Sequence, residues 1–148
     1  MSNANVTRSI NAPAAAVFHC VADIENFAQA IERITAVEFL SEQKIGVGTR
    51  FRETRVTDGR EVTNELEVTE YVEGERVRIV TDTHGTLWDT VFTVDESGTV
   101  TELTLVMDAR PYQLVSRLMV PLVMRAVCMG LTADMDAVKS YCEGHPAT

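Results

Sequence analysis

Cysteine is scarce in this sequence and is not arranged as a set of ligands. The three cysteines are Cys20, Cys128 and Cys142, and no two of them form a Cys-x-x-Cys pair. The odd number and the wide spacing exclude a disulfide framework and a zinc finger. We therefore expect three free thiols, no metal site and no cofactor.

Basic residues are few relative to acidic ones. The chain has 13 Lys and Arg residues against 22 Asp and Glu residues, and its formal net charge is −9. Such a charge disfavours binding to nucleic acid through the phosphate backbone, and it equally disfavours docking on anionic membranes through a basic patch. The charge is typical of a soluble protein.

Long apolar runs are also missing. The longest is Leu118–Met124, which contains Pro121 and falls far short of the roughly 20 residues that a membrane span requires. Near the N-terminus, His19 and Cys20 interrupt the apolar segment Ala14–Ala22, so we interpret it as a helix rather than a signal sequence. These features predict no membrane span and a cytoplasmic location.

The short motifs that identify common enzymes are absent. The chain contains no Gly-x-Ser-x-Gly, no His-Glu-x-x-His, no Walker A sequence and no Gly-x-Gly-x-x-Gly. Cys20 and His19 are adjacent on the predicted helix, so their side chains diverge by about 100° and cannot form a catalytic pair. No motif therefore names a reaction.

The length and composition are those of one ordinary domain. The chain has 148 residues, of which 45% are apolar and 24% charged. These values predict a single globular domain over residues 1–148 with a sizeable core. Residues 1–4 are small and polar, and we expect them to be disordered or a remnant of the expression vector.

The middle of the chain has the alternation of β-strands. Between Ala36 and Met107 apolar residues recur at every second position, and the turns are marked by Gly59, Gly74, Gly85 and Gly98. Turns this short join antiparallel neighbours, so these residues predict a meander of five strands. With further strands at Val6–Ile10 and near Val37–Phe39, the sheet has six or seven strands and one apolar face.

Helical patterns flank the strands. Pro13 is suited to a first helical turn, and Asp23 is suited to cap a second short helix. In the last third, apolar residues repeat at helical spacing and predict one long helix from about Pro121 to Glu143. Pro121 either kinks this helix or begins it again. A single helix about 10 Å wide cannot cover a sheet of six or seven strands spaced about 4.8 Å apart. The sheet should therefore curl around the helix and leave a cavity between them.

Several short phrases carry a family resemblance. They are Ile10–Phe18, Val21–Phe27, Gly46–Phe51, Val68–Tyr71 and the Ser97-Gly98-Thr99 turn. Together with the order of elements they resemble the START/Bet v 1-like (SRPBCC) superfamily, and within it the polyketide cyclase/dehydrase and lipid-transport group, over residues 5–143. The resemblance implies an α+β helix-grip fold: a curved antiparallel sheet around a long C-terminal helix, with two short N-terminal helices. The chain departs from its relatives at Ala28-Gln29-Ala30, where a Trp or Pro is common.

The resemblance leaves three functions open. The first is the binding or transport of a hydrophobic or amphipathic small molecule, such as a lipid, an isoprenoid or a polyketide-like compound. The second is a polyketide aromatase/cyclase or dehydratase acting in the same cavity, and the third is an interaction module without a pocket. The sequence does not decide between a monomer and a homodimer.

The inward-facing positions of the strands and the long helix give the candidate ligand-binding residues. These are Phe27, Phe39, Phe51, Arg55, Asn64, Leu66, Ile79, Trp88, Thr90, Phe92, Leu103, Leu105, Val123, Val127 and Leu131. Asp89 falls on the opposite face of its strand, and we expect it to be solvated.

Two charged residues stand among these inward positions. Glu53 and Arg55 share one face of a strand, so they can pair inside the cavity, where Arg55 with Asn64 or Thr90 would orient a ligand carbonyl or carboxylate. They can equally form a surface salt bridge where the strand reaches solvent. Glu53 and Arg55 are also the one plausible acid–base pair for an enzyme.

Overall fold

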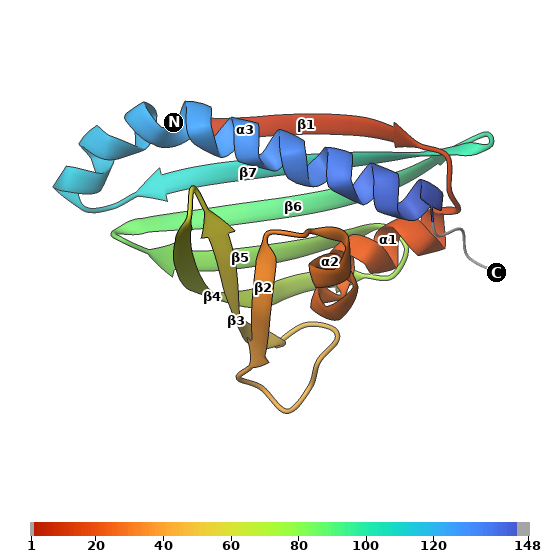
Figure 1. Cartoon of the computed structure of the whole chain (residues 1–148), viewed down its shortest axis with the longest axis horizontal. Coiled ribbons are helices and arrows are strands. Elements are labelled where there is room, and N and C mark those ends of the chain that lie inside the picture. The colour runs from red at the N-terminus through yellow and green to blue at the C-terminus, as the bar shows by residue number, and fades with distance from the viewer. Residues whose placement is uncertain (1, 145–148) are drawn as a thin grey trace.

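A computed structural model describes residues 2–144 and has the α+β architecture that the sequence predicts (Figure 1). The strands are β1 (Ser2–Ile10), β2 (Ile34–Phe39), β3 (Arg50–Thr57), β4 (Arg60–Val72), β5 (Arg76–Thr83), β6 (Thr86–Ser97) and β7 (Val100–Pro111). They form one antiparallel sheet in the order β1-β7-β6-β5-β4-β3-β2. The helices are α1 (Ala14–Ala22), α2 (Ile24–Ala30) and α3 (Leu114–Gly144).

The hairpin from β3 to β4 shows how sequence sets the turns. Asp58 and Gly59 connect the two strands with φ angles of 51° and 76°. Positive φ at both central positions suits a two-residue hairpin turn, and Asp followed by Gly is among the pairs that tolerate it best. This turn fixes the register in which Thr57 lies opposite Arg60 and Phe51 lies opposite Leu66.

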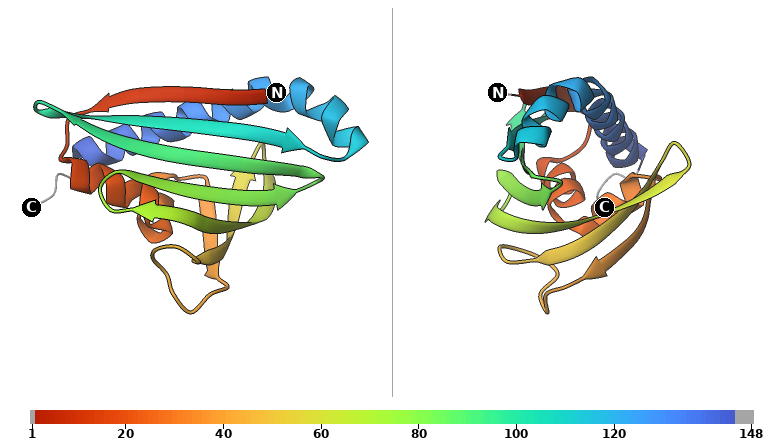
Figure 2. Two further views of the ribbon diagram at one scale, coloured as in Figure 1. Left: turned by 180° about the vertical axis from the view of Figure 1, so that it is seen from behind. Right: turned by 90° about the vertical axis from the view of Figure 1, so that its left-hand side faces the viewer.

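The sheet curls so that its concave face surrounds α3 and the two short helices. Seen from one end, β2 to β4 lie on one side and β1 with β7 on the other, and the helices fill the space between them (Figure 2). Register shifts lie between Ile34 and Ala36 and between Val68 and Glu70, where β-bulges increase the local bend.

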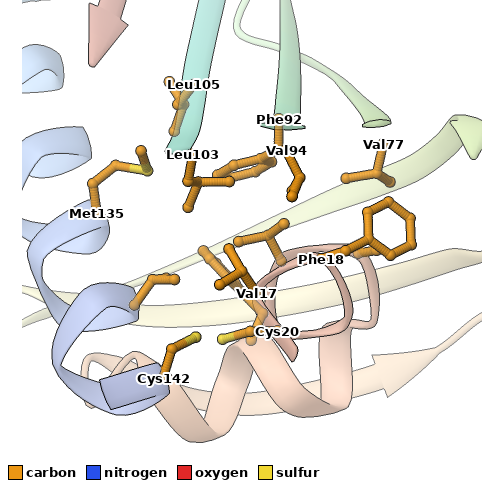
Figure 3. Packing of buried hydrophobic residues seen from close by; sticks show 14 of the residues in the cluster. Val17, Phe18, Cys20, Val77, Phe92, Val94, Leu103, Leu105, Met135 and Cys142 are labelled. Atoms are coloured by element: carbon orange, nitrogen blue, oxygen red, sulfur yellow. The ribbon is translucent and has the colours of Figure 1, made fainter. Parts of the chain in front are cut away.

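The core lies at the end of the sheet where α1 meets the second half of α3. Val17 and Phe18 of α1 and Met135 of α3 are completely buried in one cluster, where Met135 lies beside Leu103 of β7 and Phe18 lies beside Val77 of β5 (Figure 3). Figure 3 also shows Cys20 of α1 pointing toward Cys142 of α3. Both thiols are buried and free, and Cys128 is half-buried and free, as expected.

The junction of α1 and α2 differs from its predicted role. Asp23 stands at the N-cap position of α2, but its side chain makes no capping hydrogen bond. Its carboxylate instead lies 2.9 Å from Nδ1 of His19 and accepts a hydrogen bond of 3.0 Å from the Tyr71 hydroxyl. The backbone carbonyl of Asp23 accepts the first hydrogen bonds of α2, from the N–H groups of Asn26 and Phe27, while its side chain ties α1 to β4.

Both ends of the chain are more regular than predicted. The N-terminal strand includes residues 2–4, where Ala4 is buried and pairs with Met107 of β7, so these residues belong to the fold. Residue 1 lies outside the described residues. At the other end, α3 begins at Leu114, well before Pro121, which lies inside the helix. Pro121 has no N–H to donate to the carbonyl of Arg117, so it removes one hydrogen bond from α3 without ending the helix.

The length of α3 bears on the prediction that no segment of the chain is long enough to span a membrane. Its 31 residues are long and apolar enough to cross a membrane by length and composition. Arg117 and Arg125 divide this helix into short apolar runs, so the longest uninterrupted run did not reveal that the helix as a whole is long and apolar enough for a span. In the fold, Val120, Met135 and Val138 of α3 are buried as part of the protein interior.

Candidate functional site

A cavity lies between the concave face of the sheet, the two short helices and the middle of α3. About 100 Å³ of it can hold the centres of water molecules, and the whole gap between its wall atoms, including the mouth, is about 710 Å³. Its wall consists of Val21, Ala22, Ile24, Phe27, Lys44, Thr49, Phe51, Glu53, Arg55, Leu66, Val68, Ile79, Thr90, Phe92, Leu105, Met107, Leu131 and Asp134.

Most of the candidate residues from the sequence lie on this wall. They are Phe27, Phe51, Arg55, Leu66, Ile79, Thr90, Phe92, Leu105 and Leu131, together with Glu53. The strand residues among them alternate along β3 to β7, as the pattern of every second residue requires. The structure thus brings side chains from five strands and two helices to one space.

The other candidates lie elsewhere. Phe39, Asn64, Trp88, Leu103, Val123 and Val127 are not part of the wall. Leu103 is completely buried in the core, and Val123 is 38% exposed on α3. Helical spacing predicted that Val123 faces the sheet. In the first half of α3, however, a narrower side of the helix is buried than that spacing predicts.

The sequence analysis missed eight wall residues. They are Val21, Ala22, Ile24, Lys44, Thr49, Val68, Met107 and Asp134. Asp134 gave a signal that could have been used, because it stands three residues after Leu131 and four before Val138 in the apolar stripe of the helix. An acid at such a position requires a buried partner.

Asp134 is the centre of an ion cluster at one end of the cavity. Its Oδ1 accepts a hydrogen bond of 2.8 Å from Nη2 of Arg33, and its Oδ2 accepts one of 2.8 Å from Nη1 of Arg55. Nε of Arg55 also donates to Oε1 of Glu53 at 2.6 Å. Glu53 and Asp134 are 7% and 5% exposed, so these pairs are shielded from solvent. The cluster joins β3 and the start of β2 to α3.

Arg55 remains charged in this environment. Burial opposes its charge, but the neighbouring carboxylates of Glu53 and Asp134 outweigh burial and raise the pKa of the guanidinium. The guanidinium also lies over the ring of Phe27, 5.9 Å from its centroid. Among the residues that the structure describes, Nη2 of Arg55 has no hydrogen-bond partner, so this nitrogen is a donor at the polar end of the cavity.

Asp89 contradicts the expectation that it is solvated. It is 4% exposed, and both its oxygens accept hydrogen bonds from the guanidinium of Arg78. The hydrogen bonds from Arg78 lower the pKa of Asp89, against the opposing effect of burial. Asp89 was assigned correctly to the opposite face of β6, but that face is covered by long arginine side chains.

A second polar cluster lies outside the cavity, on α1. Nδ1 and Nε2 of His19 lie 2.9 Å from Asp23 and 2.8 Å from Glu73. Burial lowers the pKa of the imidazole, but the hydrogen bonds and charges of the two carboxylates outweigh it, and the pKa is raised above its usual 6.5. This cluster holds α1 against the turn after β4.

The family of the chain follows from its sequence profile. A profile for the family described as polyketide cyclase/dehydrase and lipid transport matches residues 1–143, almost the whole chain. The chain belongs to this family. The resemblance drawn from the short phrases is thereby confirmed, and the helix-grip architecture agrees with it. No curated protein matches the chain significantly.

Solved structures of low sequence identity share the fold of this family member. A START superfamily protein from Mycobacterium smegmatis superposes with a TM-score of 0.78 at 16% identity, over 96% of this chain and 97% of that chain. Ara h 8.0201 superposes with a TM-score of 0.75 at 13% identity, over 97% and 99%. The di-domain aromatase/cyclase BexL of the BE-7585A biosynthetic pathway superposes with a TM-score of 0.77 at 17% identity, over 95% of this chain and 46% of that chain.

Proposed function

We propose that this protein binds a hydrophobic or amphipathic small molecule in the cavity between the sheet and α3. The observation that carries the proposal is a wall of mainly apolar side chains with charged and hydroxyl groups confined to a few positions. Such walls favour apolar ligands, and the few polar groups set the orientation. The family description, which includes lipid transport, supports the same class of ligand.

The polar end of the cavity defines what the ligand would present. Arg55 keeps its charge and has one free nitrogen, while Thr90 offers a hydroxyl group on the wall. A ligand carbonyl or carboxylate oxygen can accept from Nη2 of Arg55, since the other two nitrogens of the guanidinium already donate to Glu53 and Asp134. Asn64, the other predicted partner, is not on the wall.

The size of the cavity limits the ligand. At roughly 15 Å³ per water position, the enclosed 100 Å³ holds the equivalent of about six or seven water molecules. The gap of about 710 Å³ that includes the mouth is within the range of roughly 300–1,000 Å³ typical of ligand sites. The space suits one aromatic ring or a short acyl segment inside, with the rest of the molecule in the mouth.

The test is ligand binding with a variant that fills the cavity. Native mass spectrometry of protein purified from its own host should detect a co-purified apolar compound. Binding of the fluorescent fatty acid cis-parinaric acid should be saturable in the wild type and lost in Ile79→Trp, because the larger side chain occupies the cavity. Val80→Trp is the matched control, since Val80 points to the other face of β5 and is not on the cavity wall.

The outcome of this test decides the proposal. Equal loss of binding in both tryptophan variants, with both folded by circular dichroism, would show that the probe binds outside the cavity. Absence of any co-purified compound, together with no saturable binding of probe, would remove the proposal.

A second candidate is a polyketide aromatase/cyclase or dehydratase. Glu53 and Arg55 are both on the cavity wall, where Glu53 could accept a proton from a methylene between two carbonyls and Arg55 could stabilise the enolate oxygen. A synthetic poly-β-ketone thioester tests this function. Equal product distributions with the wild type and with Glu53→Gln would exclude it.

The third reading, a module without a pocket, requires a filled interior. The cavity beside the ion cluster argues against it, since the wall residues leave space that no described side chain occupies.

A further inference from the structure

The first half of α3 carries apolar side chains on the side that faces away from the sheet. The exposed residues are Leu114, Val115, Leu118, Met119, Leu122, Val123 and Met129, of which the three leucines are each about 70% exposed. At 100° per residue they occupy one side of the helix, opposite the buried Ser116 and Val120. We call these seven residues the outer stripe.

The outer stripe ends abruptly along the helix. After Met129 the same side of α3 carries Asp136, Ser140 and Glu143, all exposed. The apolar window of α3 is only 11% buried, whereas the core helix of a protein of this size would be mostly buried. Soluble monomers rarely expose continuous apolar patches larger than a few hundred Å², and larger ones mark binding surfaces.

The charged residues within the segment of α3 that carries the outer stripe are all of one sign. Residues 109–133 contain no Asp or Glu, although the chain has 22 of them. Arg117 and Arg125 flank the stripe, and neither forms an ion pair with any residue that the structure describes. Although the net charge of the chain is −9, the first half of α3 has a cationic and apolar surface. The net charge therefore does not disfavour docking of this half of the helix on anionic membranes.

The charge pattern disfavours a second copy of the chain as the partner. Antiparallel pairing of two outer stripes centred on Pro121 would place Arg117 of one copy beside Arg125 of the other. No acidic residue within residues 109–133 is available to offset this repulsion. A surface that is apolar inside and anionic outside fits the stripe and its arginines better.

We propose that the outer stripe of α3 docks on the surface of a lipid bilayer containing anionic lipids. The apolar side chains would enter the boundary between headgroups and acyl chains, and Arg117 and Arg125 would contact the lipid phosphates. The geometry allows this approach because the first turns of α3 project beyond the ends of β6 and β7 (Figures 1 and 2).

The outer stripe lies close to the cavity along α3, but docking through the stripe does not depend on the proposed binding function. Leu131, on the cavity wall, follows Met129 of the stripe by two residues. Two residues correspond to about 200° around a helix, so a protein docked through the stripe holds its cavity on the other side of α3, about one helix width from the bilayer. Docking itself requires only the exposed side chains, so it can be measured without a cavity ligand.

Co-sedimentation with vesicles tests the proposal. The probe is vesicles of phosphatidylcholine and phosphatidylglycerol in a ratio of three to one, at low and high salt. The wild type should bind, and its affinity should fall as salt rises. Leu118→Glu/Leu122→Glu should bind at least about tenfold more weakly, since burying one leucine side chain already contributes about that factor.

Two further variants separate the contributions. Val62→Glu is the matched control, since Val62 is 44% exposed on β4, away from the stripe, and this variant should bind as the wild type does. Arg117→Gln/Arg125→Gln should retain weak binding but lose most of its salt dependence. All these residues are exposed, and circular dichroism with unfolding in urea checks that each variant is folded.

Several results would overturn the proposal. One is no binding by the wild type, and another is equal binding by the wild type and the double-glutamate variant. A third is a wild-type dimer, seen by analytical ultracentrifugation, that Leu118→Glu/Leu122→Glu converts to monomer, because the stripe would then be an interface between copies. Ile79→Trp keeps the result distinct from the binding function: it should lose cavity ligand and still bind vesicles.

Discussion

Replacing Asp134 with Asn tests whether the ion cluster stabilises the fold. Asp134 is 5% exposed and accepts hydrogen bonds from Arg33 and Arg55, both at 2.8 Å. Removing one partner of a buried ion pair costs about 3–5 kcal/mol, because the other charge stays buried without compensation. The side chains of Arg33 and Arg55 are 40% and 26% exposed, so water relieves part of this cost. We therefore expect Asp134→Asn to lower the free energy of unfolding by about 2 kcal/mol.

The measurement is urea unfolding followed by circular dichroism, with a thermal scan beside it. A loss of about 2 kcal/mol corresponds to a decrease in Tm of about 4–8 °C for a chain of this size. Asp136→Asn is the matched control on the same helix. Its carboxylate accepts a hydrogen bond of 2.6 Å from Arg8, but its side chain is 58% exposed, so the substitution should change the unfolding midpoint very little.

Combining Asp134→Asn with Arg55→Met shows whether the Asp134–Arg55 pair accounts for the loss of stability. In the Arg55→Met background, Asp134→Asn should cost clearly less than it does in the wild type, because one of its partners is already gone. Equal losses for Asp134→Asn and Asp136→Asn, or full additivity of Asp134→Asn with Arg55→Met, would refute the idea that the cluster couples α3 to β3.

Three further predictions concern other parts of the molecule. His19→Gln should reduce the free energy of unfolding below pH 6.5, because the pKa of His19 is raised in the folded state. The difference from wild type should disappear as the pH rises through that raised pKa, and urea unfolding at a series of pH values measures it. Gly85→Ala should destabilise more than Gly59→Ala, since both glycines have φ near +75° but an added Cβ at Gly85 alone would lie 2.6 Å from side-chain oxygens; thermal unfolding compares them, and equal decreases in Tm would contradict the steric argument. In the native protein Cys128 should react with Ellman's reagent before Cys20, because a hydrogen bond with the thiol of Cys142 and burial raise the pKa of Cys20. Equal reaction rates would show that this end of the core opens readily.

The strands could be predicted because local chemistry determines them. Glycines at the turns and apolar residues at every second position gave the five-strand meander, and short turns permitted only antiparallel pairing. The same alternation identified Phe51, Ile79 and Phe92 as inward-facing, and all three are on the cavity wall. In these strands, local pattern and tertiary structure agree.

The start of α3 and the partners of charged residues could not be predicted in this way. Pro121 was expected either to kink the helix or to begin it, and the helix in fact begins at Leu114 and continues through the proline. The local sequence does not distinguish these two cases. Asp89 seemed solvated because periodicity assigns a face, not what covers it. The place of Asp134 in the apolar stripe indicates that it needs a buried partner. Its partners, Arg33 and Arg55, lie about a hundred and about eighty residues earlier in the chain, and nothing in the local sequence identifies them.

The two outermost strands of the sheet, β1 and β2, do not pair with each other, so the sheet is an open strip. α3 lies across the seam, and on the side of β2 and β3 the seam is held by side chains such as Arg33 and Arg55 reaching Asp134. Separating α3 from β2 and β3 would therefore break the ion pairs of Asp134 while every hydrogen bond between neighbouring strands stays in place.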